Sequence, residues 1–91
     1  MKLHVLKIKD EYFQEVRSGY KKAELRKNDR DFQEGDFIYF IGVDGEELQG
    51  HDKDGTPRKY NIYRITHVLK DVPEYGLKEG YAILSIERIL Y

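Results

Sequence analysis

The sequence contains no cysteine among its 91 residues. A disulfide framework and a cysteine-based zinc site are therefore both excluded. A chain without cysteine suits a reducing compartment, and we expect a cytoplasmic location.

Long apolar runs are missing as well. The first ten residues, MKLHVLKIKD, lack the apolar stretch of a signal peptide and are expected to form a strand. No segment approaches the roughly 20 apolar residues of a membrane span, so we expect no membrane partner. The sequence also lacks repeats, low-complexity tracts and linkers, and its length predicts a single domain over residues 1–91.

The sequence has little net charge, but the charge is unevenly distributed. Residues 1–30 contain nine Lys or Arg and five Asp or Glu, whereas residues 31–91 contain seven and twelve. This asymmetry predicts a local anion-binding patch on an otherwise acidic domain. The alternative is that folding interleaves the charges and no patch forms. The three histidines, His4, His51 and His67, have no metal-ligand spacing, and we expect neither a metal ion nor another cofactor.

Hydrophobic patterning predicts a small, mainly β (α+β) domain. Strands are expected over residues 3–8, 22–27, 36–41, 60–69 and 81–90, and an exposed hairpin excursion with two Asp-Gly turns over 44–57. A helix is expected over 10–18, with Asp10 as its N-cap and Gly19 as its left-handed C-cap. Five to six mostly antiparallel strands with one N-terminal helix predict a small curled β-barrel.

Aromatic residues are expected to supply much of the core. The helix should bury Phe13 and Val16, and Phe32 should anchor the polar connection over 28–35. The other aromatic residues expected in the core are Phe37, Tyr39, Phe40 and Tyr63. His4 shares a strand face with Leu6 and Ile8, and a histidine in that position is more often structural than catalytic.

The segment Gly19–Asp36 carries the strongest functional signal, because it concentrates basic residues around the short strand Ala23-Glu24-Leu25. Side chains alternate along a strand, so Ala23 and Leu25 are expected to point inward together with Lys21. We expect Lys21 to point into a polar cleft, against a carboxylate; the alternative is a solvated amine in the turn.

Glu24 and Arg26 are expected to share one strand face with Lys22. Glu24 would then hold the Arg26 guanidinium ready for a phosphate, because arginine suits bidentate phosphate contacts better than lysine does. The alternative is a salt bridge that only orients the strand.

The order of these elements resembles the ASCH domains, which are small relatives of the PUA RNA-binding barrel. The motif G-x-K-x-x-E-x-R is present as Gly19, Lys21, Glu24 and Arg26, and the pair Gly35-Asp36 opens the next apolar strand. The fuller pattern is similar to the DUF3850 branch of that superfamily, and it covers nearly the whole chain except the loop at 44–58. The segments that carry this likeness are His4-x-Leu6-Lys7-Ile8, Glu11-Tyr12-Phe13, Glu24-Leu25-Arg26-Lys27-Asn28-Asp29-Arg30 and Glu79-Gly80-Tyr81.

The resemblance implies a PUA-like barrel whose motif lines a cleft beside the helix, with RNA or modified nucleosides as ligands. Some bacterial ASCH domains are amidohydrolases that remove the acetyl group of N4-acetylcytidine with a lysine, a threonine and a later glutamate. This sequence keeps the lysine as Lys21 and has Glu24 in place of the threonine. Glu74 lies in the region that supplies the later glutamate.

Three hypotheses about function follow. The first is an RNA- or nucleotide-binding module without catalysis, in which one tyrosine stacks on a base and the charged residues form the cleft. Its residues are Tyr20, Lys21, Lys22, Glu24, Arg26, Lys27 and Arg30, with Tyr75 as a second stacking candidate. The second is an ASCH-type amidohydrolase acting through Lys21, Glu24 and Glu74. The third is an accessory interaction protein of a phage or mobile element that uses its acidic loop at 44–55.

Overall fold

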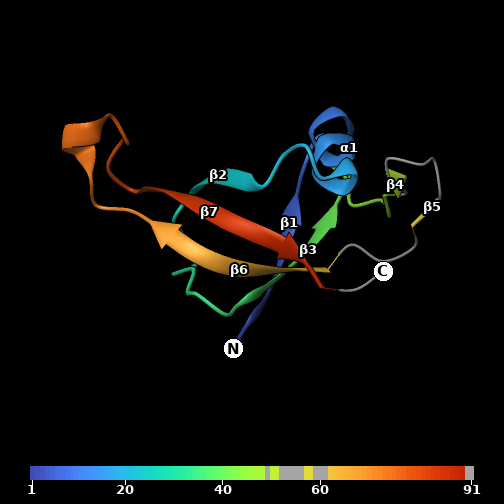
Figure 1. Ribbon diagram of the computed structural model, residues 1–91, viewed down its shortest axis with the longest axis horizontal. Helices are drawn as coiled ribbons and strands as arrows, with labels where there is room; N and C mark the ends of the chain where they lie inside the picture. Colours follow the sequence, from blue (N-terminus) through green and yellow to red (C-terminus); the bar gives the residue numbers. More distant parts are fainter. Residues whose placement is uncertain (49, 52–56, 59–61, 90–91) are drawn as a thin grey trace.

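The computed structural model describes residues 1–48, 50–51, 57–58 and 62–89. Figure 1 shows a curled sheet with one short helix near one end and a long hairpin arm reaching away from that helix. In chain order the elements are β1 (Leu3–Lys7), α1 (Asp10–Ser18), β2 (Ala23–Lys27), β3 (Phe37–Ile41), β4 (Gly50–His51), β5 (Pro57–Arg58), β6 (Ile62–Leu69), the 3₁₀ helix η1 (Pro73–Tyr75) and β7 (Tyr81–Arg88).

Five of the strands form one mixed sheet in the order β1-β3-β6-β7-β2. The pair β1–β3 is parallel, and the pairs β3–β6, β6–β7 and β2–β7 are antiparallel. The sheet curls into a half-barrel, with β1 and β2 at its two edges. The predicted mainly β fold with one early helix is therefore confirmed, and the parallel pair is a feature that the sequence pattern did not predict.

The short strands β4 and β5 pair antiparallel within the predicted hairpin excursion. Its first Asp-Gly pair forms a turn: Gly45 has a φ of 84°, and its N–H donates to the Gly42 carbonyl at 2.9 Å. The second Asp-Gly pair, at 54–55, lies outside the described residues. The same is true of residues 60, 61 and 90, which the sequence assigned to strands.

Helix α1 begins and ends for identifiable reasons. The prediction of Asp10 as N-cap is wrong by one residue: Lys9 is the extended cap residue, and Asp10 begins the helix. Its carboxylate instead accepts a hydrogen bond from Gln14 Nε2 at 3.1 Å and lies in the first turn, where the helix dipole favours an acid. The Gly19 prediction is confirmed, because its φ of 85° requires the left-handed region that glycine adopts easily.

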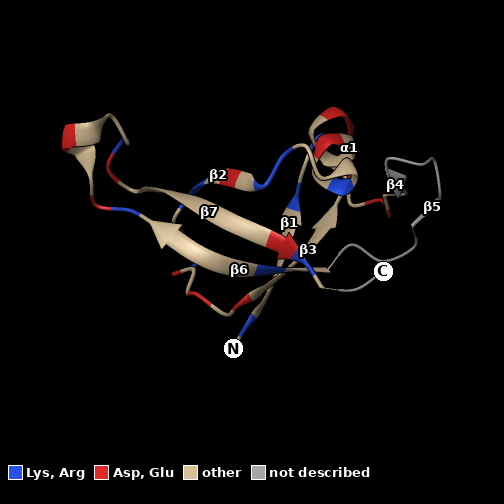
Figure 2. Cartoon of the chain, in the orientation of Figure 1, with Lys and Arg blue, Asp and Glu red and all other residues tan. Residues whose placement is uncertain are grey.

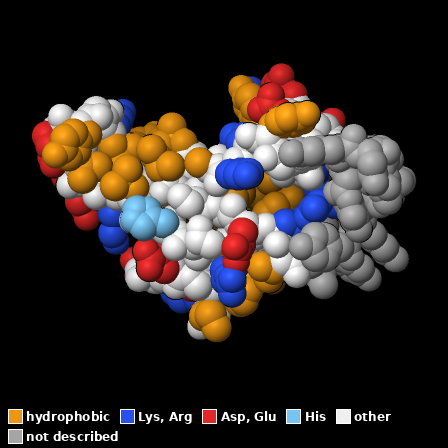
Figure 3. Space-filling model, in the orientation of Figure 1, with side chains coloured by type: hydrophobic (Ala, Val, Ile, Leu, Met, Phe, Trp, Pro, Cys, Tyr) orange, Lys and Arg blue, Asp and Glu red, His pale blue; other side chains and the backbone are white. Residues whose placement is uncertain are grey.

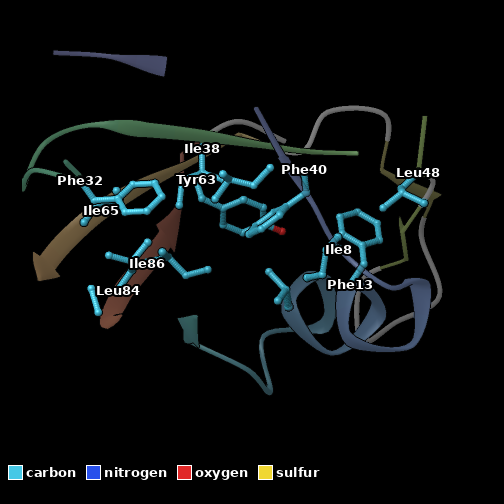
Figure 4. Packing of buried hydrophobic residues seen from close by; sticks show 13 residues of the cluster. Ile8, Phe13, Phe32, Ile38, Phe40, Leu48, Tyr63, Ile65, Leu84 and Ile86 are labelled. Atoms are coloured by element: carbon cyan, nitrogen blue, oxygen red, sulfur yellow. The ribbon is translucent and has the colours of Figure 1, made fainter. Parts of the chain in front are cut away.

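The core lies in the concavity of the half-barrel and under α1. Figure 4 shows Phe13 and Phe40 packed near Ile8 at one end, and Phe32, Ile65 and Leu84 at the other. The rings of Phe40 and Tyr63 meet edge to face with centroids 5.5 Å apart, a favoured aromatic geometry.

Two predicted core aromatics lie elsewhere. Phe37 and Tyr39 are only half-buried, because strand alternation on β3 directs Ile38 and Phe40 into the core and these two to the other face. The prediction for Phe32 is confirmed, since its side chain is 1% exposed.

His4 has the structural role that its position predicted. It is 5% exposed, and its Nε2 lies 2.9 Å from Oδ2 of the equally buried Asp36. The Asp36 carboxylate also accepts the backbone N–H groups of Lys2 at 3.0 Å and Gln33 at 3.2 Å. Burial raises the pKa of the Asp36 carboxyl, but the hydrogen bonds from His4, Lys2 and Gln33 outweigh burial and lower it below its ordinary value.

This network predicts acid sensitivity. Because the pKa of Asp36 is lower in the folded than in the unfolded chain, its ionised form stabilises the fold above the unfolded-state pKa of about 3.9. That stability is lost as the pH falls through the folded-state pKa. We expect Asp36→Asn to reduce the free energy of unfolding at neutral pH by about 1–3 kcal/mol, and to flatten the decline in melting temperature on acidification.

Thermal melts of the wild type and Asp36→Asn between about pH 6 and pH 2 measure this difference. Asp29→Asn is the matched control, because Asp29 is exposed. An Asp36→Asn variant that loses stability in acid as steeply as the wild type would contradict the assignment.

Candidate functional site

The carboxylate of Glu24 is the centre of the predicted motif. Its side chain is buried, and Lys21 Nζ donates to Oε1 while Arg26 Nε donates to Oε2 at 2.8 Å. The expected pairing of Lys21 with a carboxylate is therefore present. Figure 2 shows basic positions in and just before β2, on either side of its one acidic position.

The predicted orientation of β2 is wrong in one respect. Ala23 and Leu25 point outward, and Leu25 is 61% exposed, whereas Glu24 is 6% exposed. The inward face of β2 is therefore the charged one, because the ion pairs of Glu24 with Lys21 and Arg26 allow its carboxylate to be buried.

Two arginines connect the edges of the half-barrel. Arg26 Nη2 donates to the Lys7 carbonyl at 2.6 Å, and Arg30 Nη1 donates to the Val5 carbonyl at 2.9 Å. Both carbonyls belong to β1, at the sheet edge opposite β2. Part of the predicted basic cluster therefore links the two edge strands. We call Glu24, Arg26 and Arg30, with the carbonyls that the two arginines contact, the edge clamp.

The other members of the predicted cluster lie at the surface. Lys22 and Lys27 are exposed, with no ion pair among the described residues, and Tyr20 is 78% exposed. Lys27 lies opposite Tyr81 in the β2–β7 pairing, toward the hairpin arm, whereas Ala23 lies opposite Ser85. The cluster therefore extends along β2 instead of converging at one point.

A pocket of about 650 Å³ lies between the C-terminal end of α1 and strands β6 and β7. Figure 3 shows this face hollowed beside α1, with hydrophobic side chains in the hollow and Lys or Arg side chains beside it. Its lining residues are Val16, Arg17, Ser18, Gly19, Lys21, Lys22, Tyr63, Ile86, Glu87 and Arg88.

The charged residues around the pocket are mainly cationic. Arg17, Lys21, Lys22 and Arg88 line it, and the acidic residue among its described lining residues, Glu87, pairs with Arg64 across the β6–β7 hairpin. The pocket also offers apolar surface from Val16, Tyr63 and Ile86. Apolar walls with a few charged groups are typical of small-ligand sites, and this balance favours an anionic ligand with an apolar part.

Arg17 is the residue in this pocket that the sequence prediction did not select. Its side chain is 1% exposed, and Nη1 donates to the Tyr63 hydroxyl at 3.4 Å. The signal that could have found it is its position: it lies four residues after Phe13 and next to Val16, on the apolar face of the helix. Arg88, whose Nη1 donates to the Arg17 carbonyl at 3.4 Å, was also not selected.

The proposed catalytic set is only partly assembled. Lys21 and Glu24 are in contact, but Glu74 lies on η1, at the tip of the hairpin arm (Figure 1). Lys27 is at the end of β2 toward the arm, and Lys21 is toward α1. Glu74 is thus separated from Lys21 by the length of β2, and from Glu24 by most of that strand. Tyr75, the second stacking candidate, is 84% exposed on the same tip.

Two further observations concern the whole described chain. In the part of the chain that the structure describes, no group of three or more His, Asp or Glu side chains is arranged to hold a metal ion. No helix among the described residues has the length and apolar character needed to cross a membrane. The acidic segment 44–55, which the interaction hypothesis invoked, lies partly outside the described residues.

The chain was compared with known protein families. Residues 3–86 match the family described as "Domain of unknown function (DUF3850)". No curated protein matches the chain at a significant level.

The edge clamp predicts an energetic coupling between Glu24 and Arg26. Glu24→Gln should lower the free energy of unfolding by about 1–3 kcal/mol, because Lys21 and Arg26 then lose their charged acceptor. Arg26→Met should also destabilise, and the double variant should lose less than the sum of the two, with a coupling of about 0.5–3 kcal/mol.

Urea unfolding of the four proteins completes this cycle, and Glu79→Gln, at an exposed position in the η1–β7 connection, is the control. Additive effects of Glu24→Gln and Arg26→Met would show that the ion pair does not hold the clamp.

Proposed function

We propose a function for this chain, which belongs to the DUF3850 family, from the pocket beside α1. We infer that the domain is a noncatalytic module that binds RNA or nucleotides. The phosphates of the ligand would lie at the cationic rim of that pocket. The observation that carries the proposal is the set of four cationic side chains around a pocket whose acidic residue is already paired. We propose a cytoplasmic location for this activity, consistent with the absence of cysteine.

We also propose that the family is a branch of the ASCH domains and related to the PUA barrel. The motif Gly19, Lys21, Glu24 and Arg26 supports this assignment, as does a curled sheet that follows one early helix. The cleft implied by that relationship lies beside the helix, as does the pocket.

Some residues of the predicted cluster would contact the ligand, and others hold the fold. Lys22 is the exposed lysine on the pocket wall, and Lys27 extends the cationic surface along β2. Lys21 lines the pocket but shares its charge with Glu24. Arg26 and Arg30 act indirectly, since their hydrogen bonds to β1 hold β2 in position. Tyr20, next to Lys21 and highly exposed, offers a ring for stacking.

Electrostatic binding of this kind has a measurable signature. A short single-stranded RNA with a 5′-hydroxyl end should bind at low salt, and log K should fall with log salt by about 0.7 per neutralised phosphate. Lys22→Met should reduce the steepness of that dependence by about 0.7, because one phosphate contact is lost. Fluorescence anisotropy with a labelled ten-nucleotide RNA between about 20 and 200 mM salt gives both values.

The stacking assignment is tested by comparing two exposed tyrosines. Tyr20→Ser should cost about 1–3 kcal/mol of binding free energy. Tyr75→Ser, at the tip of the arm, should leave the affinity unchanged. Absence of RNA binding by the wild type at low salt would overturn the proposed function. A larger loss of affinity in Tyr75→Ser than in Tyr20→Ser would show that the base stacks on the arm instead.

The amidohydrolase hypothesis receives less support from the geometry. Lys21 contacts the Glu24 carboxylate, whereas Glu74 lies on η1 at the far tip of the hairpin arm, so the three proposed catalytic residues are not brought together. Incubation of the protein with N4-acetylcytidine, followed by chromatography, separates the two hypotheses. We expect no cytidine to form.

A further inference from the structure

The Arg17 guanidinium is buried with most of its hydrogen-bonding capacity unused. Its side chain is 1% exposed, and only Nη1 has an acceptor, the Tyr63 hydroxyl at 3.4 Å. Nε and Nη2 have no hydrogen-bond partner among the described residues. A buried donor without an acceptor costs about 1–3 kcal/mol, and more when the group is charged. The pocket is therefore lined by a cationic group with two nitrogens that have no acceptor among the described residues.

The two nitrogens without partners define the kind of acceptor that fits. In a planar guanidinium, Nε and Nη2 lie on the same edge and direct their N–H groups in parallel, whereas Nη1 points to the other side. Two parallel donors match two oxygens of one oxyanion in a bidentate contact. Tyr63, which is 2% exposed, holds Nη1 and so fixes the orientation of the open edge.

The described charged side chains around Arg17 favour an anion. Arg17 lies in the last turn of α1, where the partial negative charge of the helix end stabilises a cation. Lys22 lines the same pocket, and Glu87 is engaged by Arg64, so it does not neutralise Arg17. Arg17 and Lys22 both line the pocket, so an anion that reaches the buried Nε and Nη2 of Arg17 also lies near a second positive charge.

We infer that Arg17 anchors a terminal phosphate, the monoester group of a nucleotide or of an RNA end; this inference rests on the proposed function. A terminal phosphate is favoured over an internal phosphodiester because Arg17 is only 1% exposed. An internal phosphate would have to bring nucleotides on both sides into the pocket. A monoester also keeps a third oxygen for Lys22 when two contact Arg17.

The first experiment observes Arg17 directly. In proton–nitrogen NMR spectra, the Nε–H signal of Arg17 should shift on titration with uridine monophosphate and on titration with inorganic phosphate. Uridine, which lacks the phosphate, should leave that signal unchanged. Arg17→Met removes the signal and thereby assigns it.

The second experiment compares ends of the same RNA. An oligonucleotide with a 5′- or 3′-phosphate should bind the wild type about tenfold more tightly than one with hydroxyl ends, since one charge-assisted contact supplies about 1.4 kcal/mol. Arg17→Met and Arg17→Lys should both lose this preference, because neither has two parallel donors. The control is Lys78→Met, on the connection between η1 and β7, which should keep it.

The melting temperature of Arg17→Met without ligand shows whether this variant is folded and can be compared with the wild type. Replacing an incompletely paired buried arginine by an apolar residue of similar length is often neutral or stabilising. Arg17→Met should therefore melt at or above the wild-type temperature in phosphate-free buffer. Phosphate should raise the melting temperature of the wild type but not of Arg17→Met.

The outcomes separate the inference from the proposed function. RNA binding with equal affinity for phosphate and hydroxyl ends, and an unmoved Arg17 signal, overturns the inference and leaves the function standing. If the Arg17 signal shifts with phosphate but the protein binds no RNA, the inference is supported and the proposed function is contradicted. Binding of a peptide C-terminal carboxylate through Arg17, with no response to phosphate, overturns the inference.

Discussion

One buried carboxylate organises the contact between the two edges of the sheet. Glu24 holds Arg26 in an orientation from which its guanidinium reaches the Lys7 carbonyl on the opposite edge of the sheet. Without the contacts of Arg26 and Arg30 with β1, the two edge strands would be joined only through the three strands between them. A charged cluster is thus used where a closed barrel would have a row of backbone hydrogen bonds. The burial of Glu24 is tolerated because both of its oxygens accept from cations.

This use of charge divides the basic residues into two groups. Arg26 and Arg30 satisfy carbonyls of β1, and their donors are committed to the fold. Lys22 and Arg17 line the pocket instead. The acidic residue among the described lining residues, Glu87, is already paired with Arg64. The sequence motif and the pocket are therefore neighbours with different roles: the first sets the position of β2, and the second offers positive charge to a ligand. Lys21 belongs to both.

Hydrophobic periodicity predicted most of the elements, because strands β1, β3, β6 and β7 bury alternate residues and the stripe of Phe13 and Val16 marks α1. It failed for β2, where the usual rule would bury Leu25 and expose Glu24. The ion pairs of Glu24 with Lys21 and Arg26 reverse that order. Both partners lie within three residues of Glu24, but a rule that reads only the alternation of apolar residues does not take ion pairs into account. The parallel neighbours β1 and β3 were also not predictable, since their pairing depends on where β2 is placed. Arg17 was missed because an arginine is ordinarily assigned to the surface, although its spacing from Phe13 matches the buried face.

The topology has a consequence for how the chain folds during synthesis. Strand β2 is complete by Lys27, but the strand beside it in the sheet is β7, which ends at Arg88. Until β7 has left the ribosome, β2 has no neighbouring backbone to pair with, and the hairpin β6–β7 must enter between β3 and β2. Such non-local pairing makes the search for the native state slow relative to a helical domain of this size. Strand β2, with its charged residues, therefore stays unpaired until the last strand of the sheet is available.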